Sequence, residues 1–276
     1  MNAKIQLKKT SLIDYPGRVS SVFFFSGCNL RCPWCHNREL VLGGAESCVS
    51  PEAALAHLRK RRSVLGGVVL SGGEPCLWED LPDLICEIRK LALQVKLDTN
   101  GMFPEMLEKL FNSEVSRPDY IALDLKIAPA RYRELLPPGG GNFDPTEALM
   151  RSAALIRESG ISHEYRTLAL PPLVGSDGFI TEKDIEALAP LVDDSPWHFR
   201  PFAGGNCLDP AWDALEETAS AAQARVKALL EFAHTKTQEE GLTRRHKDHG
   251  KKVEEVPQDD TGGRKEEDLT QRHKDI

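Results

Sequence analysis

Short apolar runs and longer amphipathic segments alternate along this chain. The apolar runs are typical of buried strands, and they lie at residues 19–25, 67–70, 94–97, 120–123, 161–170 and 197–202. Between them, apolar side chains recur three and four positions apart, which predicts amphipathic helices at 53–62, 81–91, 104–111, 145–158 and 181–188. An alanine-rich segment, 211–234, predicts one more helix.

Three of the expected helices begin at a residue that can cap free backbone N–H groups. Ser50, Asp144 and Thr181 stand at these N-cap positions. Proline directly follows Ser50 and Asp144, at the first helical position, where its missing N–H costs nothing. These local signals fix where the helices start independently of the apolar pattern.

Strict alternation of strands and helices implies a parallel sheet with helices outside it. A complete barrel of eight strand–helix units needs about 250 residues, whereas six units are present here. The sequence therefore predicts an α/β fold, an incomplete (β/α)6 barrel of the TIM type with one open side. A doubly wound sheet is the alternative, because the pattern alone does not separate the two.

The composition changes at about residue 235. From there to residue 276 the chain is dominated by Lys, Arg, Glu, Asp, Gln and Gly and has no apolar periodicity. Such a segment buries too little apolar surface to offset the entropy lost on ordering. We therefore expect a barrel domain over residues 1–234 and a charged, disordered tail over residues 235–276.

Bulk properties narrow the class of protein. With 41% hydrophobic and 28% charged residues, the chain has an ordinary globular composition. Its net charge of −7 argues against nucleic acid as a partner. No apolar run is long enough to span a membrane, and the N-terminus lacks a signal-peptide pattern. An odd number of cysteines, seven, favours reduced thiols and metal ligation over disulfides, so a cytoplasmic protein is expected.

Three of these cysteines follow the first apolar run after a Ser-Gly pair. Cys28, Cys32 and Cys35 have the spacing C-x-x-x-C-x-x-C, which lets three thiols converge on one metal centre. Iron–sulfur clusters that transfer electrons normally use four cysteines. Three ligands leave one iron open to a small molecule, which predicts a site for chemistry.

Two other interpretations of this motif stay open. His36 could complete a zinc site of three thiolates and one imidazole, although it is adjacent to Cys35 and would strain to reach the same ion. Alternatively, Cys48 or Cys76 could act as a fourth cluster ligand and make an electron carrier. Cys86 is expected to be buried in a helix, and Cys207 has no assigned role.

Polar residues also follow the next three strands. Gly72 and Gly73 let the backbone approach a ligand closely, and the carboxylate of Glu74 can accept a hydrogen bond from an ammonium group. Each of these groups has a plain structural alternative. The Gly-Gly-Glu loop and residues 98–101 could be simple turns, and Asp124 and Lys126 could be a simple ion pair.

Arg166 lies in the middle of the fifth expected strand. A buried arginine must be paired. Its partner is expected to be a carboxylate of a ligand or a neighbouring glutamate.

The cysteine spacing, with an aromatic residue, Trp34, before the third cysteine, resembles the radical S-adenosylmethionine superfamily. The resemblance extends over residues 5–230. It implies a [4Fe–4S] cluster on the three cysteines, with S-adenosylmethionine chelating the fourth iron. It also implies that Gly72, Gly73 and Glu74 bind the methionine amino group, and that Asp98, Thr99 and Asn100 lie near the ribose.

Within this superfamily the chain is most similar to the activating enzymes of glycyl-radical enzymes. His36 and Asn37 match their Cys-His-Asn loop. The resemblance implies a monovalent-cation site at Asp98, Thr99 and Asp124. It also implies active-site positions for Lys126 and Arg166.

The stretches 13–17, 96–101 and 164–167 look most like the longer anaerobic ribonucleoside-triphosphate reductase activating proteins. One departure is that some relatives carry a histidine near residues 200–203, and this chain does not; Arg200 or His198 is the candidate substitute.

The function that this resemblance implies is reductive cleavage of S-adenosylmethionine to a 5′-deoxyadenosyl radical. That radical would install a glycyl radical on a partner enzyme, with a flavodoxin or ferredoxin as electron donor. The alternatives are the activation of another glycyl-radical enzyme and radical chemistry on a small molecule. A zinc or iron–sulfur binding module without catalysis is the alternative from a different class.

Overall fold

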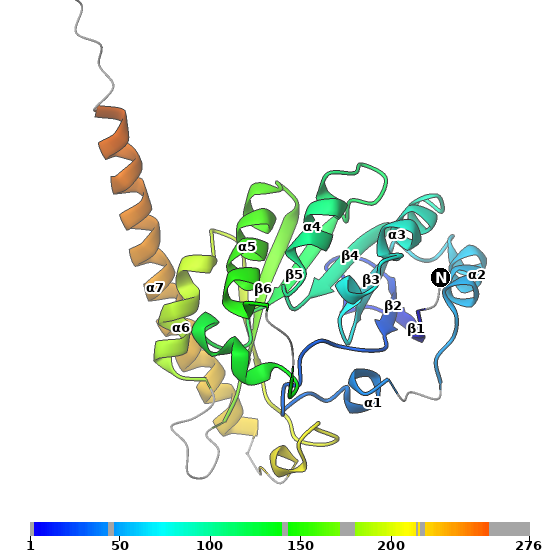
Figure 1. Ribbon diagram of the computed structural model, residues 1–276, viewed down its shortest axis with the longest axis horizontal. Coiled ribbons are helices and arrows are strands. Elements are labelled where there is room, and N and C mark those ends of the chain that lie inside the picture. The colour runs from blue at the N-terminus through cyan, green and yellow to red at the C-terminus, as the bar shows by residue number, and fades with distance from the viewer. Residues whose placement is uncertain are drawn as a thin grey trace, which may run out of the picture. The chain divides into compact units, whose positions relative to one another are not determined.

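The protein forms one sheet of seven strands, β1 to β7, ordered in space as in the sequence (Figure 1). The computed structural model describes residues 3–43, 47–139, 143–171, 180–213, 215 and 219–253. The strands are β1 (Ile5–Ser11), β2 (Ser20–Phe25), β3 (Gly67–Gly72), β4 (Gln94–Thr99), β5 (Tyr120–Asp124), β6 (Ser162–Ala169) and β7 (Trp197–Pro201). Strands β2 to β7 are parallel, which confirms the six expected strands.

Strand β1 was not expected from the sequence. It pairs antiparallel with β2, Ile5 opposite Phe25. Its polar lysines and threonine interrupt the apolar pattern because β1 lies at the sheet edge, where one side faces solvent. The strand thereby adds an antiparallel edge beside β2, the strand that leads into the cysteine loop, residues 28–37.

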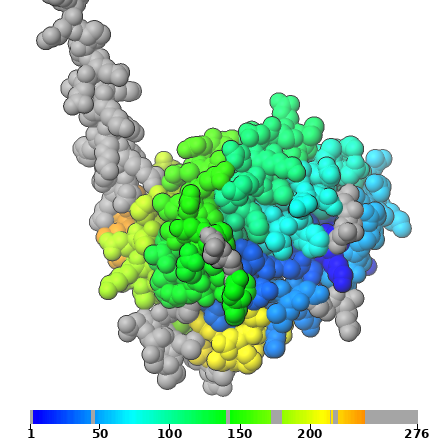
Figure 2. All heavy atoms as spheres, in the orientation of Figure 1, coloured from blue at the N-terminus to red at the C-terminus, as the bar shows by residue number. Residues whose placement is uncertain are grey.

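Helices α1 to α6 lie in the connections between successive parallel strands, and α3, α4 and α5 lie side by side along one face of the sheet (Figures 1 and 2). The α-helices are α1 (Arg38–Val41), α2 (Pro51–Arg61), α3 (Leu81–Arg89), α4 (Pro104–Phe111), α5 (Pro145–Glu158), α6 (Glu182–Leu188) and α7 (Ala219–Val253). Short 3-10 helices are η1 (Pro75–Leu77), η2 (Pro129–Leu135), η3 (Ala189–Leu191) and η4 (Pro210–Trp212). The side chains of Ser50, Asp144 and Thr181 cap α2, α5 and α6 as predicted.

The strand order shows that the fold is an incomplete barrel. A doubly wound sheet reverses its strand order at a switch point, whereas here each strand neighbours the next one in the sequence. In the described part of the chain β1 and β7 are the two edges of the sheet and do not pair with each other. The barrel is therefore open on one side, as expected.

The two faces of the sheet differ in chemistry because successive side chains in a strand point to opposite faces. Val95, Leu97, Ile121 and Leu123 are fully buried in the core that also contains the apolar side chains of α3, α4 and α5. Most of the alternate positions of β4 to β6 carry charged or polar side chains. The inner face of the barrel is consequently polar toward the carboxyl ends of the strands.

The C-terminal segment departs from expectation. Helix α7 begins at Ala219, after η4, and continues to Val253, beyond residue 234, where the sequence predicted the helix to end; disorder of the tail stays a prediction. Leu229 and Ala233 are buried and anchor the helix. Once a helix has formed, each further residue adds a hydrogen bond, and Lys, Glu, Gln and Arg are good helix formers. The rest of the expected tail, 254–276, lies outside the described residues.

The chain divides into two compact units, 1–240 and 241–276. The expected boundary at residue 234 stays a prediction. Among the described helices, α7 included, we find no segment with the length and apolar character to cross a membrane.

Candidate active site

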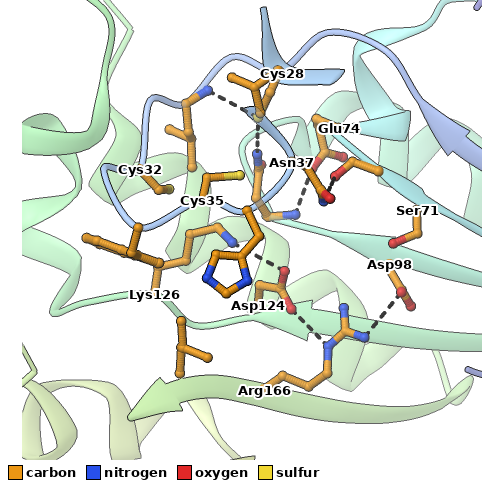
Figure 3. A pocket seen from close by; sticks show the side chains of 18 of the residues that line it. Cys28, Cys32, Cys35, Asn37, Ser71, Glu74, Asp98, Asp124, Lys126 and Arg166 are labelled. Carbon is orange, nitrogen blue, oxygen red and sulfur yellow. Dashed lines mark hydrogen bonds and ion pairs between the residues drawn. The ribbon is translucent and has the colours of Figure 1, made fainter. Parts of the chain in front are cut away.

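A cavity of about 540 Å³ lies at the carboxyl ends of the parallel strands. This volume falls within the usual range for small-molecule sites. All fifteen predicted site residues line it: Cys28, Cys32, Trp34, Cys35, His36, Asn37, Gly72, Gly73, Glu74, Asp98, Thr99, Asn100, Asp124, Lys126 and Arg166. The fold thus brings together residues from the ends of four strands, β3 to β6, and from the cysteine loop (Figure 3).

The cysteine loop is held by backbone hydrogen bonds to distant segments. The N–H of Gly27 donates to the carbonyl of Leu40 at 2.7 Å, and the N–H of Arg31 donates to Leu135 at 2.7 Å. On the other side, Leu208 N–H donates to the carbonyl of Cys35 at 2.9 Å. Because the loop is tied on both sides, the fold itself sets the positions of the thiols.

The three thiols are free and largely shielded from solvent. Burial raises the pKa of Cys28 to about 11 and that of Cys32 to about 12. Thiols bind metals as thiolates, so binding of a metal centre here releases protons. In the described part of the chain, no three His, Cys, Asp or Glu side chains gather closely enough to hold a single metal ion. Cluster ligands are spaced more widely because each thiolate binds a different iron, and the three cysteines fit such a group.

The candidates for a fourth ligand lie elsewhere. Cys48 and Cys76 do not line the cavity. Cys76 is buried behind Glu74, whose carboxylate accepts its backbone N–H at 3.0 Å. Cys86 is half-buried rather than buried as expected. Cys207 is fully buried, and its N–H donates to Asp213 at 2.8 Å.

Gly72 and Gly73 are required by the packing of two loops. A Cβ on Gly73 would lie 1.9 Å from the carbonyl oxygen of Gly27, and one on Gly72 would lie 2.3 Å from the backbone N of Phe25. Gly72 also has a positive φ of 115°. The pair therefore lets the end of β3 contact the backbone that leads into the cysteine loop. The two glycines are therefore needed for backbone packing, in addition to the close approach to a ligand that the sequence predicted.

Glu74 connects the end of β3 to the end of β4. Its buried carboxylate accepts hydrogen bonds from Thr99 Oγ1 and from Asn100 N–H, both at 2.8 Å, as well as from Cys76. Burial raises its pKa, although these hydrogen bonds oppose the shift. Asn100 in turn donates through Nδ2 to Cys28 Sγ at 3.8 Å. Glu74 thus orders the β4 loop, and that loop contacts Cys28, one of the three cysteines of the motif.

Aromatic packing supports the outer side of the cysteine loop. Trp34 is buried against Trp212, with ring centroids 5.5 Å apart. The ring of His36 packs against that of Phe202 at a tilt of 51°, with ring centroids 5.7 Å apart. Asn37 Nδ2 donates to the carbonyl of Gly72 at 3.4 Å, which joins the two loops again.

Arg166 pairs with two aspartates and not with a neighbouring glutamate, which was one of the two partners expected from the sequence; the other, a carboxylate of the ligand, stays a prediction. Its Nε donates to Asp124 Oδ1 at 2.9 Å and its Nη1 donates to Asp98 Oδ2 at 3.2 Å (Figure 3). Lys126 Nζ lies 3.3 Å from Asp124 Oδ2. Burial alone would raise the pKa of Asp124, but the charges of Arg166 and Lys126 outweigh it and lower this pKa to about 2. Both aspartates expected at a monovalent-cation site are therefore paired with side-chain cations.

Two charged residues of the inner face were not selected as site residues from the sequence. Lys96 is 2% exposed, and its Nζ lies 2.8 Å from Asp98 Oδ1 and 3.5 Å from Glu164 Oε1. A signal was present, because charges of opposite sign stand two positions apart in β4 and in β6, on one face of each strand. Of the two candidates for the missing histidine, Arg200 lines the cavity and His198 does not.

Comparisons with known proteins agree with this site. The family described as the radical SAM superfamily matches residues 22–177. The chain is 31% identical over 190 residues to MJ1227 of Methanocaldococcus jannaschii, which is described as a proposed glycyl-radical enzyme activating enzyme. The match covers 67% of this chain and 72% of that protein. It is 32% identical over 127 residues to the pyruvate formate-lyase-activating enzyme of Clostridium pasteurianum, covering 44% of this chain and 50% of the enzyme. It is 33% identical over 119 residues to the pyruvate formate-lyase 1-activating enzyme of Escherichia coli K12, and this match covers 41% of this chain and 48% of the enzyme. The chain thus matches about half the length of these two enzymes.

Solved structures show the same fold at low sequence identity. A radical SAM methyltransferase from Sphaerobacter thermophilus superposes with a TM-score of 0.56 at 17% identity, covering 82% of this chain and 66% of that one. Streptococcus suis SuiB bound to S-adenosylmethionine superposes with a TM-score of 0.52 at 16% identity, covering 74% and 44%. Fold, cysteine motif and family match agree, and the chain belongs to the radical S-adenosylmethionine superfamily of enzymes.

Proposed function

We propose that this enzyme installs a glycyl radical on a partner protein. The observation that carries the proposal is the convergence of three free cysteines, in C-x-x-x-C-x-x-C spacing, on one polar cavity in a chain whose relatives are activating enzymes. Membership of the superfamily implies a [4Fe–4S] cluster and S-adenosylmethionine. Cys28, Cys32 and Cys35 would hold the cluster and leave one iron free for the methionine end of the ligand.

When bound, the cluster would supply the radical chemistry, which is the one-electron reductive cleavage of S-adenosylmethionine that leads to removal of a hydrogen atom from a glycine of the partner. The protein orients the ligand and excludes water. It also keeps the reacting atoms in a fixed geometry, through the loops that Glu74 and the two glycines tie together.

Glu74 is the proposed acceptor for the ammonium group of S-adenosylmethionine. Its three hydrogen-bond donors are neutral groups, so its negative charge is not matched by a side-chain cation within those contacts. A carboxylate has about four acceptor positions, which leaves room for one more donor. Thr99 and Asn100 would lie beside the ribose, and Lys126 and Arg166 would face the carboxylate or the reacting carbon.

The partner is the finer part of the proposal. The open side of the barrel suits a macromolecule, because a loop that carries the target glycine must enter. The sequence stretches 13–17, 96–101 and 164–167 favour the anaerobic ribonucleoside-triphosphate reductase as that partner. We further propose a flavodoxin or ferredoxin as electron donor, a cytoplasmic location, and no role for nucleic acid or membrane.

A monovalent cation at Asp98 and Asp124, which the resemblance also implies, would have to bind carboxylates that already pair with side-chain cations. No part of the proposed reaction is therefore assigned to it.

Activation of another glycyl-radical enzyme is the second candidate, because pyruvate formate-lyase-activating enzymes are among the relatives. Candidate partners would be compared by the glycyl-radical signal in electron paramagnetic resonance, with the glycine-to-alanine form of each partner as control. A signal on the ribonucleotide reductase that the control lacks supports the proposal. A signal on a different glycyl-radical enzyme alone contradicts the assigned partner.

The chemistry is tested by anaerobic reconstitution with iron and sulfide, reduction with dithionite, and an assay for 5′-deoxyadenosine. We expect about four irons per chain, and product formation that Cys32→Ala abolishes and Cys76→Ala leaves intact. Loss of the cluster in Cys76→Ala, or zinc as the bound metal, would instead support a binding module without catalysis. Small-molecule radical chemistry would give 5′-deoxyadenosine without any glycyl radical on a partner.

A further inference from the structure

Charged side chains on the inner face of the sheet form one continuous network of six ion-paired residues, four of which are labelled in Figure 3. Cations and carboxylates alternate along it in the order Lys126, Asp124, Arg166, Asp98, Lys96 and Glu164. The network begins beside the cysteine loop and runs across β5, β4 and β6. Three positive charges face three negative charges, so the formal charge of this set is balanced.

Within this set of ion pairs, both carboxylate oxygens of Asp98 and both of Asp124 lie near a cationic side chain. Asp98 places Oδ1 2.8 Å from Lys96 Nζ and Oδ2 3.2 Å from Arg166 Nη1. Asp124 places Oδ1 2.9 Å from Arg166 Nε and Oδ2 3.3 Å from Lys126 Nζ. An added monovalent cation would have to displace one of these groups or leave an unbalanced positive charge in a poorly solvated place, which is costly.

Lys96 has the least exposed side chain of these cations. Its side chain is 2% exposed, it bridges Asp98 and Glu164, and its Nζ lies 5.8 Å from the ring centroid of Tyr120. The other oxygen of Glu164 accepts a hydrogen bond from Tyr120 OH at 3.1 Å and lies 3.7 Å from His198 Nε2. The ammonium group therefore contacts one carboxylate oxygen of Asp98 while Arg166 contacts the other.

We propose that Lys96 is a built-in cation that takes the charge-compensating place of the expected monovalent ion. It is a positioning residue, because it fixes Asp98 and, through Asp98, the guanidinium of Arg166 that lines the cavity. The inference rests on the proposed function in one respect, which is that S-adenosylmethionine binds in this cavity. A protein with this arrangement binds its ligand equally well whether or not sodium or potassium is present.

The first test compares the holoenzyme in potassium, sodium and tetramethylammonium chloride at one ionic strength. We expect the Kd for S-adenosylmethionine to change by less than about twofold among the three salts, well below the coupling between two linked ligands. We also expect no specific broadening of the ²³Na resonance by the wild-type protein. A Kd at least about fivefold lower in potassium or sodium, or a bound sodium signal that Asp98→Asn removes, would overturn the proposal.

Two substitutions of the same residue sharpen the test. Lys96→Ala removes the charge and leaves space for an ion, whereas Lys96→Met removes the charge and fills the space. We expect potassium to lower the Kd of Lys96→Ala by about fivefold or more relative to tetramethylammonium, and not to rescue Lys96→Met. The exposed Lys60→Ala is the matched control. If Lys96→Ala behaves like Lys60→Ala in every salt, Lys96 has no positioning role.

Removal of a buried partner could prevent folding of the single variants. The double variant Lys96→Ala with Glu164→Gln removes one charge of each sign and is the fallback for the same salt comparison. Its unfolding midpoint in potassium and in tetramethylammonium gives a result that does not depend on the ligand. If S-adenosylmethionine fails to bind in any salt, the proposed function fails, whereas the ²³Na and unfolding measurements still decide the role of Lys96.

Discussion

Replacement of Arg166 tests whether the charged inner face holds the barrel together. Arg166→Met keeps the length of the side chain and removes both ion pairs, at 2.9 Å to Asp124 and 3.2 Å to Asp98. The exposed fractions of the three side chains are 14% for Arg166, 11% for Asp98 and 32% for Asp124. The substitution therefore leaves two poorly solvated carboxylates without their shared partner.

Breaking a buried ion pair by removing one partner costs about 3–5 kcal/mol, because the remaining charge is left uncompensated. Asp124 is reached by some water and Asp98 keeps Lys96, so the lower end of this range applies. We expect Arg166→Met to lower the free energy of unfolding by about 3 kcal/mol at pH 7.

The loss should depend on pH. In the wild type the pKa of Asp124 falls from 3.8 to about 2. Because the folded-state pKa is the lower one, this carboxylate stabilises the fold above about pH 4, and the stabilisation disappears as the pH falls from about 4 to about 2. The shift corresponds to about 2 kcal/mol at most, since solvent screens a partly exposed group. The difference between Arg166→Met and wild type should shrink over the same pH range.

The assay is urea unfolding of the reduced apoprotein at several pH values between 2 and 7. Arg151→Met is a matched control, because Arg151 also bridges two carboxylates, Glu105 and Glu108, both at 2.6 Å. Those groups are 42–73% exposed, so we expect a loss below about 1 kcal/mol. Equal losses for the two variants, or a loss in Arg166→Met that is independent of pH, would refute the reasoning.

Three further changes probe the cysteine loop and its supports. Gly73→Ala should displace the loop and reduce the iron bound after reconstitution, whereas Gly66→Ala, whose added Cβ has no neighbour closer than 3.6 Å, should bind iron normally. Thr99→Val removes the hydroxyl that donates to buried Glu74 and should lower the free energy of unfolding in urea by about 1–3 kcal/mol. A loss of stability no larger than that of the exposed Thr235→Val would contradict the structural role of this bond. Trp212→Ala removes the ring that packs on Trp34 and should cost about 3–5 kcal/mol and speed iron release to a chelator; unchanged release would show that the loop does not depend on this contact.

Local patterns in the sequence determined much of the fold. Apolar residues located the six parallel strands, because the face of a strand that packs in the core leaves an apolar signature that needs no knowledge of neighbours. Caps at Ser50, Asp144 and Thr181 located three helix starts for the same reason, since a cap acts within four residues. The sequence pattern did not predict the edge strand β1 or the length of α7, because a half-exposed strand and a charged helix carry weak apolar signals.

The sequence also located the site, because the carboxyl ends of parallel strands meet at one edge of the sheet. Only the tertiary structure decided which side chains pair there. Arg166 joins Asp98 across 68 positions of sequence and Asp124 across 42, although Glu164 is nearer along the chain. Such pairing depends on strand register, and a shift by one residue would turn every side chain of a strand to the other face. Local sequence fixes which residues reach the edge, but the hydrogen-bonded register of the whole sheet fixes which of them touch.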